Sequence, residues 1–483
     1  MDNIKQKTFN GIIWKSIQSF ATTGLSFLFM IFMTRLLTPN DYGLIGMLSV
    51  FIVLAQTFID SGFGQALVRE NKRTIVDEST VFFFNLIAST LCYIILYISA
   101  PFIAQFYDMP ILKNILRIQG LMLIISAFYS VHLLIYSINL DFKTPTIIGL
   151  LCNLLSGISG VIMAYYGWGV WALVGQQLLL TIFSAICYSL ISSWKPQLVF
   201  SFKSFKRMFS FGSKLLGSRL LNIAYNKAAP IFIGKYYSAS DLGLYSKAEQ
   251  IASFPCNTFY SIISSVSYPV LCKLQTDKTQ LTNIYRKFIR ITASVIFPVM
   301  LLLCIFGTTL MSALFGEKWI NAGIYLSIMS LPWMMVPIQC LNLNILLVTG
   351  RSDLMLRLEI IGKVLGFSVL FITLPISIIV FSISSAIVSF TCFFINTYYT
   401  KKVIQYPLKE QILDLLTPLI ISLIVSTTAF LCTMSISNDM IKLVIGITSG
   451  SLLYIIIAHC FKIHEYSELK NLIKQRFVKS EKN

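Results

Sequence analysis

The sequence predicts an all-α polytopic membrane protein with about fourteen transmembrane helices, and three observations lead to this prediction. Of its 483 residues, 56% are hydrophobic and only 12% are charged, and the mean hydropathy is +0.76. Apolar runs of about 20 residues, the length that crosses a bilayer as a helix, follow one another almost from end to end. Lys and Arg gather in alternate connections between the runs. These connections are too short to hold a soluble catalytic domain.

The apolar runs place the expected spans in order along the chain. They cover residues 11–34, 43–61, 81–100, 115–138, 146–166, 169–192, 211–234, 242–270, 289–315, 321–348, 355–374, 378–399, 413–435 and 440–461. The first run follows Lys5 and Lys7 and is too long for the apolar core of a signal peptide, so we expect a retained helix. The division of residues 355–399 is the least marked, because only Pro375 interrupts that stretch.

The positions of Lys and Arg predict the orientation of the spans. Most of them lie in the N-terminal tail, in the loops after every second span and in the C-terminal tail, as Arg69, Lys203, Lys273 and Lys401 do. Cytoplasmic loops retain positive charge, so we expect both termini in the cytoplasm and an even number of spans. The net charge of +18 therefore reflects membrane topology and attraction to anionic lipid headgroups, and it does not indicate nucleic-acid binding.

A short internal repeat relates the first span to the seventh. The stretch IFMTRLLTPNDYGL (31–44) aligns with IFIGKYYSASDLGL (231–244) at an offset of 200 residues. Both stretches end in D-x-G-L, where the Asp is placed to cap the next helix. Because the offset separates units of six spans, which is an even number, the two units have the same orientation in the membrane.

This repeat predicts two pseudo-symmetric six-helix lobes followed by two further helices. We place the N-terminal lobe at residues 1–200 and the C-terminal lobe at 201–405. The two C-terminal helices occupy 406–461, and a basic cytoplasmic tail covers 462–483. Paired lobes of this kind enclose a central site and alternate its access between the two sides of the membrane.

Three cations lie inside the seventh span with no acid among them: Lys214, Arg219 and Lys227. Each cation facing lipid at the helix centre costs about 2.5–3.5 kcal/mol. Lys214 is close enough to the cytoplasmic end to reach the surface. Arg219 and Lys227 lie deeper and about 80° apart around the helix, so they can share one broad face. We predict that they face a wet cavity and bind an anion; pairing with an acid of another helix stays open.

Further charged residues within the spans complete the candidate site. Lys247, near the start of the eighth span, is a fourth candidate for substrate binding. Asp60, Glu249 and Glu359 are candidates for coupling to an ion, because a desolvated carboxylate readily takes up a proton. Structural alternatives are a cap or turn at Asp60 and a helical ion pair between Glu359 and Lys363.

Motifs for covalent chemistry, nucleotide hydrolysis and metal binding are missing from the sequence. The ten cysteines occur singly, without a CxxC pair, and the three histidines form no cluster. The chain contains no P-loop, no GxSxG and no HExxH motif. We therefore predict a transporter rather than an enzyme, with no metal or organic cofactor; H⁺ or Na⁺ coupling stays open.

Several stretches together resemble a known family of transporters. They are FNGIIWKSI (9–17), TRLLTPNDYGLIGM (34–47), FIDSGFGQALV (58–68), FGSKLLGSRLLNIAYNKAAPIFIGKYYSASDLGLYSKAEQIASFP (211–255) and SYPVLCKLQTD (267–277). In this order and spacing the chain resembles the polysaccharide-exporter flippases of the multidrug/oligosaccharidyl-lipid/polysaccharide (MOP) superfamily, in the branch of colanic-acid and teichuronic-acid exporters.

The resemblance implies both a substrate and a location. The substrate would be an undecaprenyl-pyrophosphate-linked oligosaccharide repeat unit for O-antigen, capsule or exopolysaccharide, flipped across the bacterial cytoplasmic membrane through a cationic lumen. Partners implied are membrane lipids and the polymerase and chain-length components of a polysaccharide pathway. Relatives often carry an acid near the middle of the seventh span, whereas this chain has NKAAPIFIGK (226–235) with Lys227 and Pro230. That departure puts a counter-ion role for the seventh span in doubt.

Other functions stay open at this point. A drug or organic-cation antiporter on the same fold would favour buried acids and aromatic rings over deep cations. A flippase for a lipid-linked peptidoglycan precursor would need almost the same chemistry as a glycan flippase. A membrane polymerase or ligase would carry a large outward loop with catalytic residues, whereas YYGWGV (165–170) and FGEKW (315–319) are short.

Overall fold

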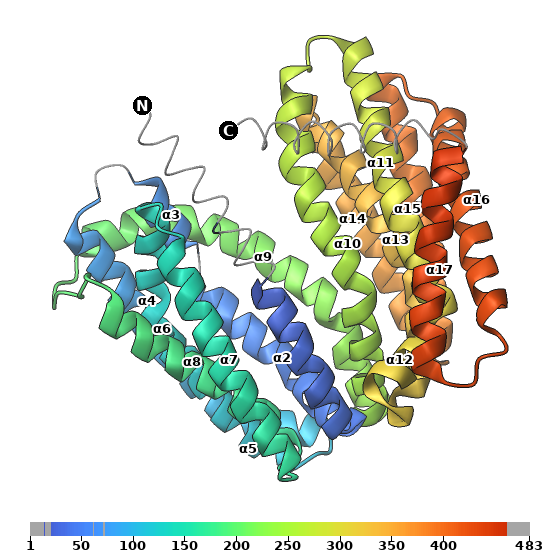
Figure 1. Ribbon diagram of the computed structural model, residues 1–483. Helices are drawn as coiled ribbons and strands as arrows, with labels where there is room; N and C mark the ends of the chain where they lie inside the picture. Colours follow the sequence, from blue (N-terminus) through green and yellow to red (C-terminus); the bar gives the residue numbers. More distant parts are fainter. Residues whose placement is uncertain (1–13, 15–20, 61, 71–72, 461–483) are drawn as a thin grey trace, which may run out of the picture. The chain divides into compact units, whose positions relative to one another are not determined.

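The computed structural model describes residues 14, 21–60, 62–70 and 73–460, and these residues form helices joined by short connections (Figure 1). A first helix covers residues 21–36. The others are α2 (Pro39–Asp60), α3 (Phe63–Arg69), α4 (Ile75–Phe106), α5 (Ile111–Gln119), α6 (Leu121–Ile138), α7 (Lys143–Tyr165), α8 (Val170–Ile191), α9 (Phe202–Tyr236), α10 (Ala239–Lys273), α11 (Lys278–Ile305), α12 (Gly307–Phe315), the 3₁₀ turn η1 (Glu317–Trp319), α13 (Ile320–Val348), α14 (Ser352–Thr373), α15 (Ile378–Ile404), α16 (Leu408–Thr433) and α17 (Asp439–Cys460). The predicted tail at 462–483 lies outside the described residues.

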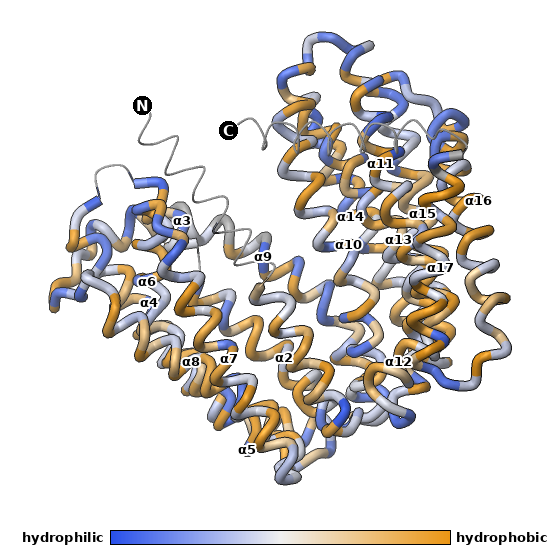
Figure 2. The backbone as a smooth tube through the Cα atoms, viewed as in Figure 1, coloured by the Kyte–Doolittle hydropathy of each residue, from blue (hydrophilic) through white to orange (hydrophobic). Residues whose placement is uncertain are grey.

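The all-α prediction is confirmed for the described part of the chain. There, ten helical stretches are long and apolar enough to cross a membrane. The remaining four of the fourteen expected spans correspond to the helix at 21–36 and to α9, α10 and α14, so the full count stays a prediction. Figure 2 shows hydrophobic residues along the helices and hydrophilic residues gathered at their ends. Lipid offers no hydrogen-bond partner to the backbone, so a continuous helix is the natural state of such runs.

Two expected boundaries are resolved by the structure. Residues 355–399 form two helices, α14 and α15, because α14 ends before Pro375. The expected span 289–315 is wrong as a single helix, since Phe306 separates α11 from α12. α12 packs closely on α13 directly after this break, since a Cβ on Gly307 would lie 2.8 Å from the carbonyl oxygen of Gly323.

The chain divides into two compact units, Met1–Gly243 and Leu244–Asn483, and the boundary falls inside α10. In the first unit, α9 packs on α2, α3 and α4. Two ion pairs hold its ends: Arg207 Nη2 lies 2.8 Å from Asp77 Oδ1, and Lys235 Nζ lies 3.0 Å from Asp108 Oδ2. The first pair joins α9 to α4, and the second joins it to the connection between α4 and α5.

The internal repeat has a structural counterpart within the first unit. Asp41 Oδ2 accepts from the backbone amide of Thr38 at 2.9 Å, and Asp241 Oδ2 accepts from that of Ser238 at 3.2 Å. The helix starts also cross closely, because a Cβ on Gly43 would lie 1.6 Å from the Ala239 carbonyl oxygen. The reciprocal contact is equally tight: a Cβ on Gly243 would lie 1.9 Å from the carbonyl oxygen of Pro39. The repeated D-x-G-L therefore encodes a cap and a close crossing in both copies.

The second unit contains a polar network that ties α16 to its neighbours. Arg286 of α11 donates to Asp414 at 2.9 Å and to Glu410 at 2.6 Å, and Arg290 and Tyr406 also contact Asp414. The Asp414 side chain is 6% exposed. Next to it, Gln411 donates to Asn342 of α13 at 3.0 Å. This network anchors the first of the two C-terminal helices.

Candidate functional site

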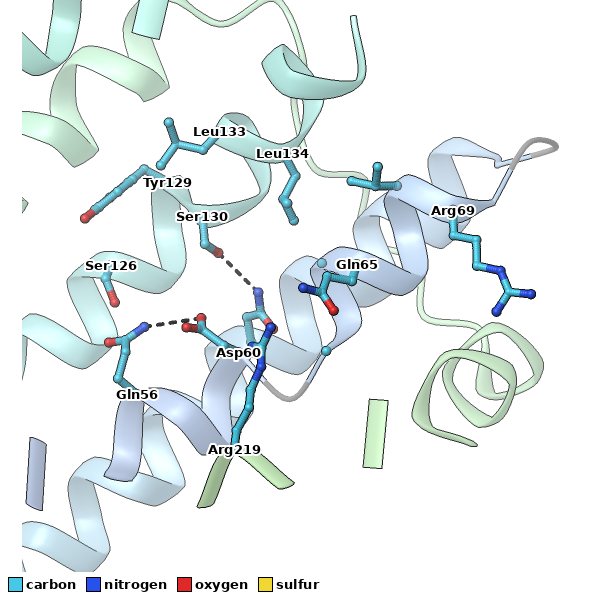
Figure 3. A pocket seen from close by; sticks show the side chains of 14 residues that line it. Gln56, Asp60, Gln65, Arg69, Ser126, Tyr129, Ser130, Leu133, Leu134 and Arg219 are labelled. Atoms are coloured by element: carbon cyan, nitrogen blue, oxygen red, sulfur yellow. Dashed lines mark hydrogen bonds between the residues drawn. The ribbon is translucent and has the colours of Figure 1, made fainter. Parts of the chain in front are cut away.

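The first unit contains a pocket of about 600 Å³ lined by residues of α2, α3, α4, α6 and α9. We call it the Arg219 pocket. Its wall combines charged and neutral polar groups with the side chains of Leu133, Leu134 and Val68. The polar residues that carry the argument below are Gln56, Asp60, Gln65, Asn85, Ser130 and Arg219. Figure 3 shows most of these side chains converging on one space from separate helices.

Asp60 and Arg219 bring opposite charges to this pocket from distant parts of the chain. Asp60 is the last residue of α2, and Arg219 lies near the middle of α9. Gln56 Nε2 donates to Asp60 Oδ1 at 3.4 Å, one helical turn back. The two charged side chains lie in one pocket without forming an ion pair within 4.0 Å. Arg219 is therefore near a counter-charge but keeps donors for a ligand.

The turn between α2 and α3 shapes one wall of the pocket. Gly62 has a φ of 73°, in the left-handed region that glycine adopts without a Cβ penalty. It lies between α2, which ends at Asp60, and α3, whose residues Gln65 and Arg69 also line the pocket. The glycine-rich turn thus positions residues of the site. Asp60 lies next to this turn, which is the structural alternative given for it above.

Asn85 of α4 and Ser130 of α6 form another part of the pocket wall. Asn85 Nδ2 donates to Ser130 Oγ at 3.1 Å, which joins the two helices at the pocket. Tyr129, the neighbour of Ser130, also lines the pocket, and its ring stacks on Tyr188 with centroids 5.7 Å apart. Stacking of this kind restricts the ring to one position. The wall is therefore neutral, polar and held in place by contacts outside the pocket.

The other predicted cations have separate surroundings. The side chain of Lys214 lies outside what the structure describes. Lys227 is half-buried on α9 and does not line the Arg219 pocket, and no described carboxylate lies within 4.0 Å of its ammonium. Lys247, in the second unit, is only 3% exposed. Its Nζ lies 5.9 Å from the ring centroids of both Phe315 and Trp319.

The remaining predicted acids lie in the second unit and do not belong to this pocket. Glu249 is half-buried on α10, two residues after Lys247. Glu359 Oε2 lies 4.0 Å from Lys363 Nζ, which is the helical ion pair given above as its structural alternative. Of the seven residues predicted from the sequence, the structure brings Asp60 and Arg219 together, and the roles of all seven stay predictions.

Sequence reasoning missed most of the pocket lining apart from Asp60 and Arg219. Gln65 belongs to the SGFGQ stretch (61–65) but carries no charge that would single it out. Arg69 is counted among the loop cations that predict the membrane orientation. Asn85 and Ser130 are polar residues inside apolar runs, which is a usable signal, but many such residues only join helices. Their place at one pocket depends on how α4 and α6 pack.

The chain matches one protein family over more than half of its length. The family described as "Polysaccharide biosynthesis protein" matches residues 32–323. The teichuronic acid biosynthesis protein TuaB of Bacillus subtilis (strain 168) is 27% identical over 463 residues, which covers 94% of this chain and 96% of TuaB. The lipopolysaccharide biosynthesis protein WzxC of Escherichia coli (strain K12) is 21% identical over 323 residues, which covers 66% of this chain and 65% of WzxC.

Solved structures share the fold. Lipid II flippase MurJ in its inward closed conformation superposes with a TM-score of 0.73 at 15% identity, covering 95% of this chain and 99% of MurJ. A multidrug resistance MATE family transporter of the MOP superfamily, in an inward-facing conformation, has a TM-score of 0.62 at 14% identity, covering 82% of this chain and 99% of the transporter. At these identities the likeness concerns the fold alone.

Together these observations establish the class of the protein. Its apolar helices and its fold are those of a multi-pass membrane protein. The family match confirms the resemblance drawn from the sequence motifs. The chain belongs to the polysaccharide biosynthesis protein family.

Proposed function

We propose that this protein is a flippase that moves an undecaprenyl-pyrophosphate-linked oligosaccharide repeat unit across the bacterial cytoplasmic membrane. The family match and relatives named for teichuronic acid, succinoglycan and lipopolysaccharide biosynthesis or transport support a role in making a surface polysaccharide. The observation that carries the proposal is Arg219, a cation within a membrane helix, at a polar pocket of about 600 Å³. A diphosphate is the anion that such a cation would bind.

The proposed membrane arrangement follows the sequence pattern. Fourteen helices cross the membrane as two pseudo-symmetric six-helix lobes and two C-terminal helices, with both termini in the cytoplasm. Lobes of this kind alternate the access of a central cationic lumen between the two sides. The protein then works as a transporter, not as an enzyme, and supplies its product to the polymerase and chain-length components of a polysaccharide pathway.

In this mechanism the cations of α9 act in sequence on the phosphate groups. Lys214, nearest the cytoplasmic end of the expected span, binds the headgroup first. Arg219 and Lys227 then bind it further into the membrane. Their charge replaces the hydration that the diphosphate loses on entering the membrane. The polyprenyl chain stays in lipid while the polar head crosses, so no helix has to enclose it.

Two energy sources fit a sequence without a nucleotide-binding motif: coupling to H⁺ or Na⁺, and downhill movement pulled by later polymerisation. Among the three candidate acids, Asp60 is the one that lines the Arg219 pocket. A carboxylate there can take up H⁺ or bind Na⁺ when Arg219 engages the substrate phosphate. Glu249 and Glu359 remain candidates in the second unit, where Glu359 already has Lys363 as a partner.

Two alternatives are distinguished by substrate. A drug antiporter would take organic cations, which Arg219 at the pocket opposes. A peptidoglycan-precursor flippase shares the fold and would bind the same diphosphate, so it differs only in the sugar recognised. Substrate identity therefore has to be measured on the accumulated lipid.

The decisive experiment deletes the gene and identifies the lipid-linked intermediate that accumulates on the cytoplasmic leaflet. We expect an undecaprenyl-pyrophosphate-linked repeat unit of a surface polysaccharide, with normal peptidoglycan synthesis. Restoring the wild-type gene should clear the intermediate, and restoring Arg219→Ala at matched membrane level should not. Accumulation of the peptidoglycan precursor would indicate a peptidoglycan-precursor flippase. A changed resistance to cationic dyes, without any accumulated lipid intermediate, would indicate a drug antiporter.

A further inference from the structure

Asn85 brings to the Arg219 pocket a hydrogen-bond acceptor that has no partner among the described residues. Asn85 is 6% exposed and lines the pocket, and its Oδ1 is buried without a hydrogen bond. An unsatisfied buried polar atom is destabilising, so natural proteins rarely retain one without a use. A donor arriving in the pocket would remove this cost.

The hydrogen bonds of Ser130 indicate which end of the Asn85 amide has no partner. Ser130 Oγ donates to the carbonyl oxygen of Ala127 at 3.1 Å, which uses its only proton. Toward Asn85, Ser130 can therefore only accept, and it accepts from Nδ2 at 3.1 Å. Turning the amide over would require Ser130 to donate to Asn85 and to give up its bond to Ala127. Oδ1 thus remains an acceptor, and it requires a donor from the ligand.

A diphosphate alone cannot satisfy this wall of the pocket. Phosphate oxygens accept hydrogen bonds, so they suit Arg219 but not Asp60 or the Asn85 Oδ1 atom. A sugar hydroxyl both donates and accepts. A ligand that satisfies all three residues carries an anion beside hydroxyl donors, which is the chemistry of a glycosyl phosphate. The pocket volume of about 600 Å³ is in the range of small-molecule sites.

We infer that the Arg219 pocket binds the first sugar together with its phosphate, with ring hydroxyls donating to Asp60 and to Asn85 Oδ1. This inference rests on the proposed function and adds the part of the substrate that the first unit recognises. Discrimination then arises at the sugar beside the diphosphate and not at the polyprenyl chain. Tyr129, held by Tyr188, supplies a fixed ring at the same wall.

The test measures binding to the purified full-length protein with four probes. One is farnesyl diphosphate without a sugar; the others carry glucose, galactose or N-acetylglucosamine on the diphosphate. For the wild type we expect at least one glycosylated probe to bind about tenfold more tightly than the bare diphosphate, as expected for one or two added hydrogen bonds. Asn85→Leu should reduce this ratio to within about twofold.

Matched variants separate recognition from folding. Asn153→Leu removes an amide that pairs with Ser26 elsewhere in the first unit, at 3.2 Å, and should keep the ratio. Ser130→Ala frees the Asn85 amide and should lower the ratio even where Asn85→Leu folds poorly. Arg219→Ala should weaken all four probes alike.

The outcomes distinguish this inference from the proposed function. A sugar preference that survives in both Asn85→Leu and Ser130→Ala would overturn the assignment of the sugar to this wall. Equal binding of the bare and all glycosylated probes by the wild type would overturn it too, while diphosphate binding still stood. Failure of every probe to bind the wild type would remove the proposed function and this inference with it.

Discussion

Arg219 has surroundings that would accommodate a cation in α9 if this helix crosses the membrane as proposed. A cation facing lipid at the centre of a helix costs about 2.5–3.5 kcal/mol. Here the side chain faces a polar pocket that also contains Asp60, Gln65 and Asn85. The nearby Asp60 carboxylate and the amide groups offset part of this cost, although Asp60 and Arg219 do not form an ion pair within 4.0 Å.

Arg219→Ala is expected to abolish surface polysaccharide while the protein still inserts into the membrane. Loss of a charged hydrogen bond to phosphate should weaken substrate binding by about 1.5–3 kcal/mol, or roughly 10- to 150-fold. Arg219→Lys should retain part of the activity if only the positive charge is needed. It should retain little if the guanidinium has to donate two parallel hydrogen bonds to phosphate. Both variants are tested by measuring surface polysaccharide at equal amounts of protein in the membrane.

The control for this prediction is Lys235→Ala on the same helix. Lys235 pairs with Asp108, which is 80% exposed, and such surface pairs contribute about 0–1 kcal/mol. Its glycan output should stay near that of the wild type. Normal output from Arg219→Ala would show that the pocket cation is not part of transport.

Lys227→Ala tests the second deep cation of α9. Lys227 has no described carboxylate within 4.0 Å, so its removal breaks no ion pair and should leave the thermal stability of the purified protein unchanged. We expect glycan output to fall as in Arg219→Ala, because the substrate loses its second positive contact. Full output at wild-type protein level would restrict substrate binding to the Arg219 pocket.

At the scale of elements, the crossing of the helix starts of α2 and α10 depends on two glycines. Gly43→Ala would place a Cβ 1.6 Å from the backbone oxygen of Ala239, which cannot move as a side chain would. We expect a loss of about 1–3 kcal/mol in the free energy of unfolding, the usual cost of overpacking. Thermal unfolding in detergent should show a lower midpoint.

A glycine with free space provides the comparison for Gly43. At Gly149 in α7, an added Cβ would have no neighbouring atom within 4 Å, so Gly149→Ala should be neutral or stabilising by about 0.5–1 kcal/mol. Equal midpoints for the Gly43 and Gly149 variants would contradict the close crossing.

The polar network of the second unit yields another prediction for an element. Asp414→Asn removes the carboxylate that Arg286, Arg290 and Tyr406 share, so α16 should lose roughly 2–4 kcal/mol of stabilisation. Proteolysis of the purified protein should then cleave near α16 sooner. Asp353→Asn, which breaks an exposed pair with Arg351, should leave stability near that of the wild type. Equal sensitivity of both variants would argue against anchoring by the network.

At the scale of the whole molecule, the charge pattern predicts which loops face the cytoplasm. Trp168 is 55% exposed between α7 and α8, and Leu198 is 93% exposed between α8 and α9. In a cysteine-free background, Trp168→Cys should react with an impermeant maleimide in intact cells. Leu198→Cys should react only after the membrane is opened. The reverse labelling would invert the proposed topology.

The helices and the membrane class followed from the sequence because both depend on local properties. A run of about 20 apolar residues must satisfy its own backbone in lipid, and a helix does so without help from distant residues. The caps at Asp41 and Asp241 were equally local, since each acid reaches a backbone amide three residues back. The break at Phe306 did not follow from the sequence, and α12 packs closely on α13 directly after it.

The sequence by itself determined that this chain is a helical membrane protein with cations in α9, and that Arg219 and Asp60 are unusual for their surroundings. Only the tertiary structure decided that these two residues share a pocket with Asn85, whereas Lys247 is buried beside aromatic rings. The physical reason is that burial and partners of a charged side chain depend on which helices pack together, and those helices are far apart in the chain.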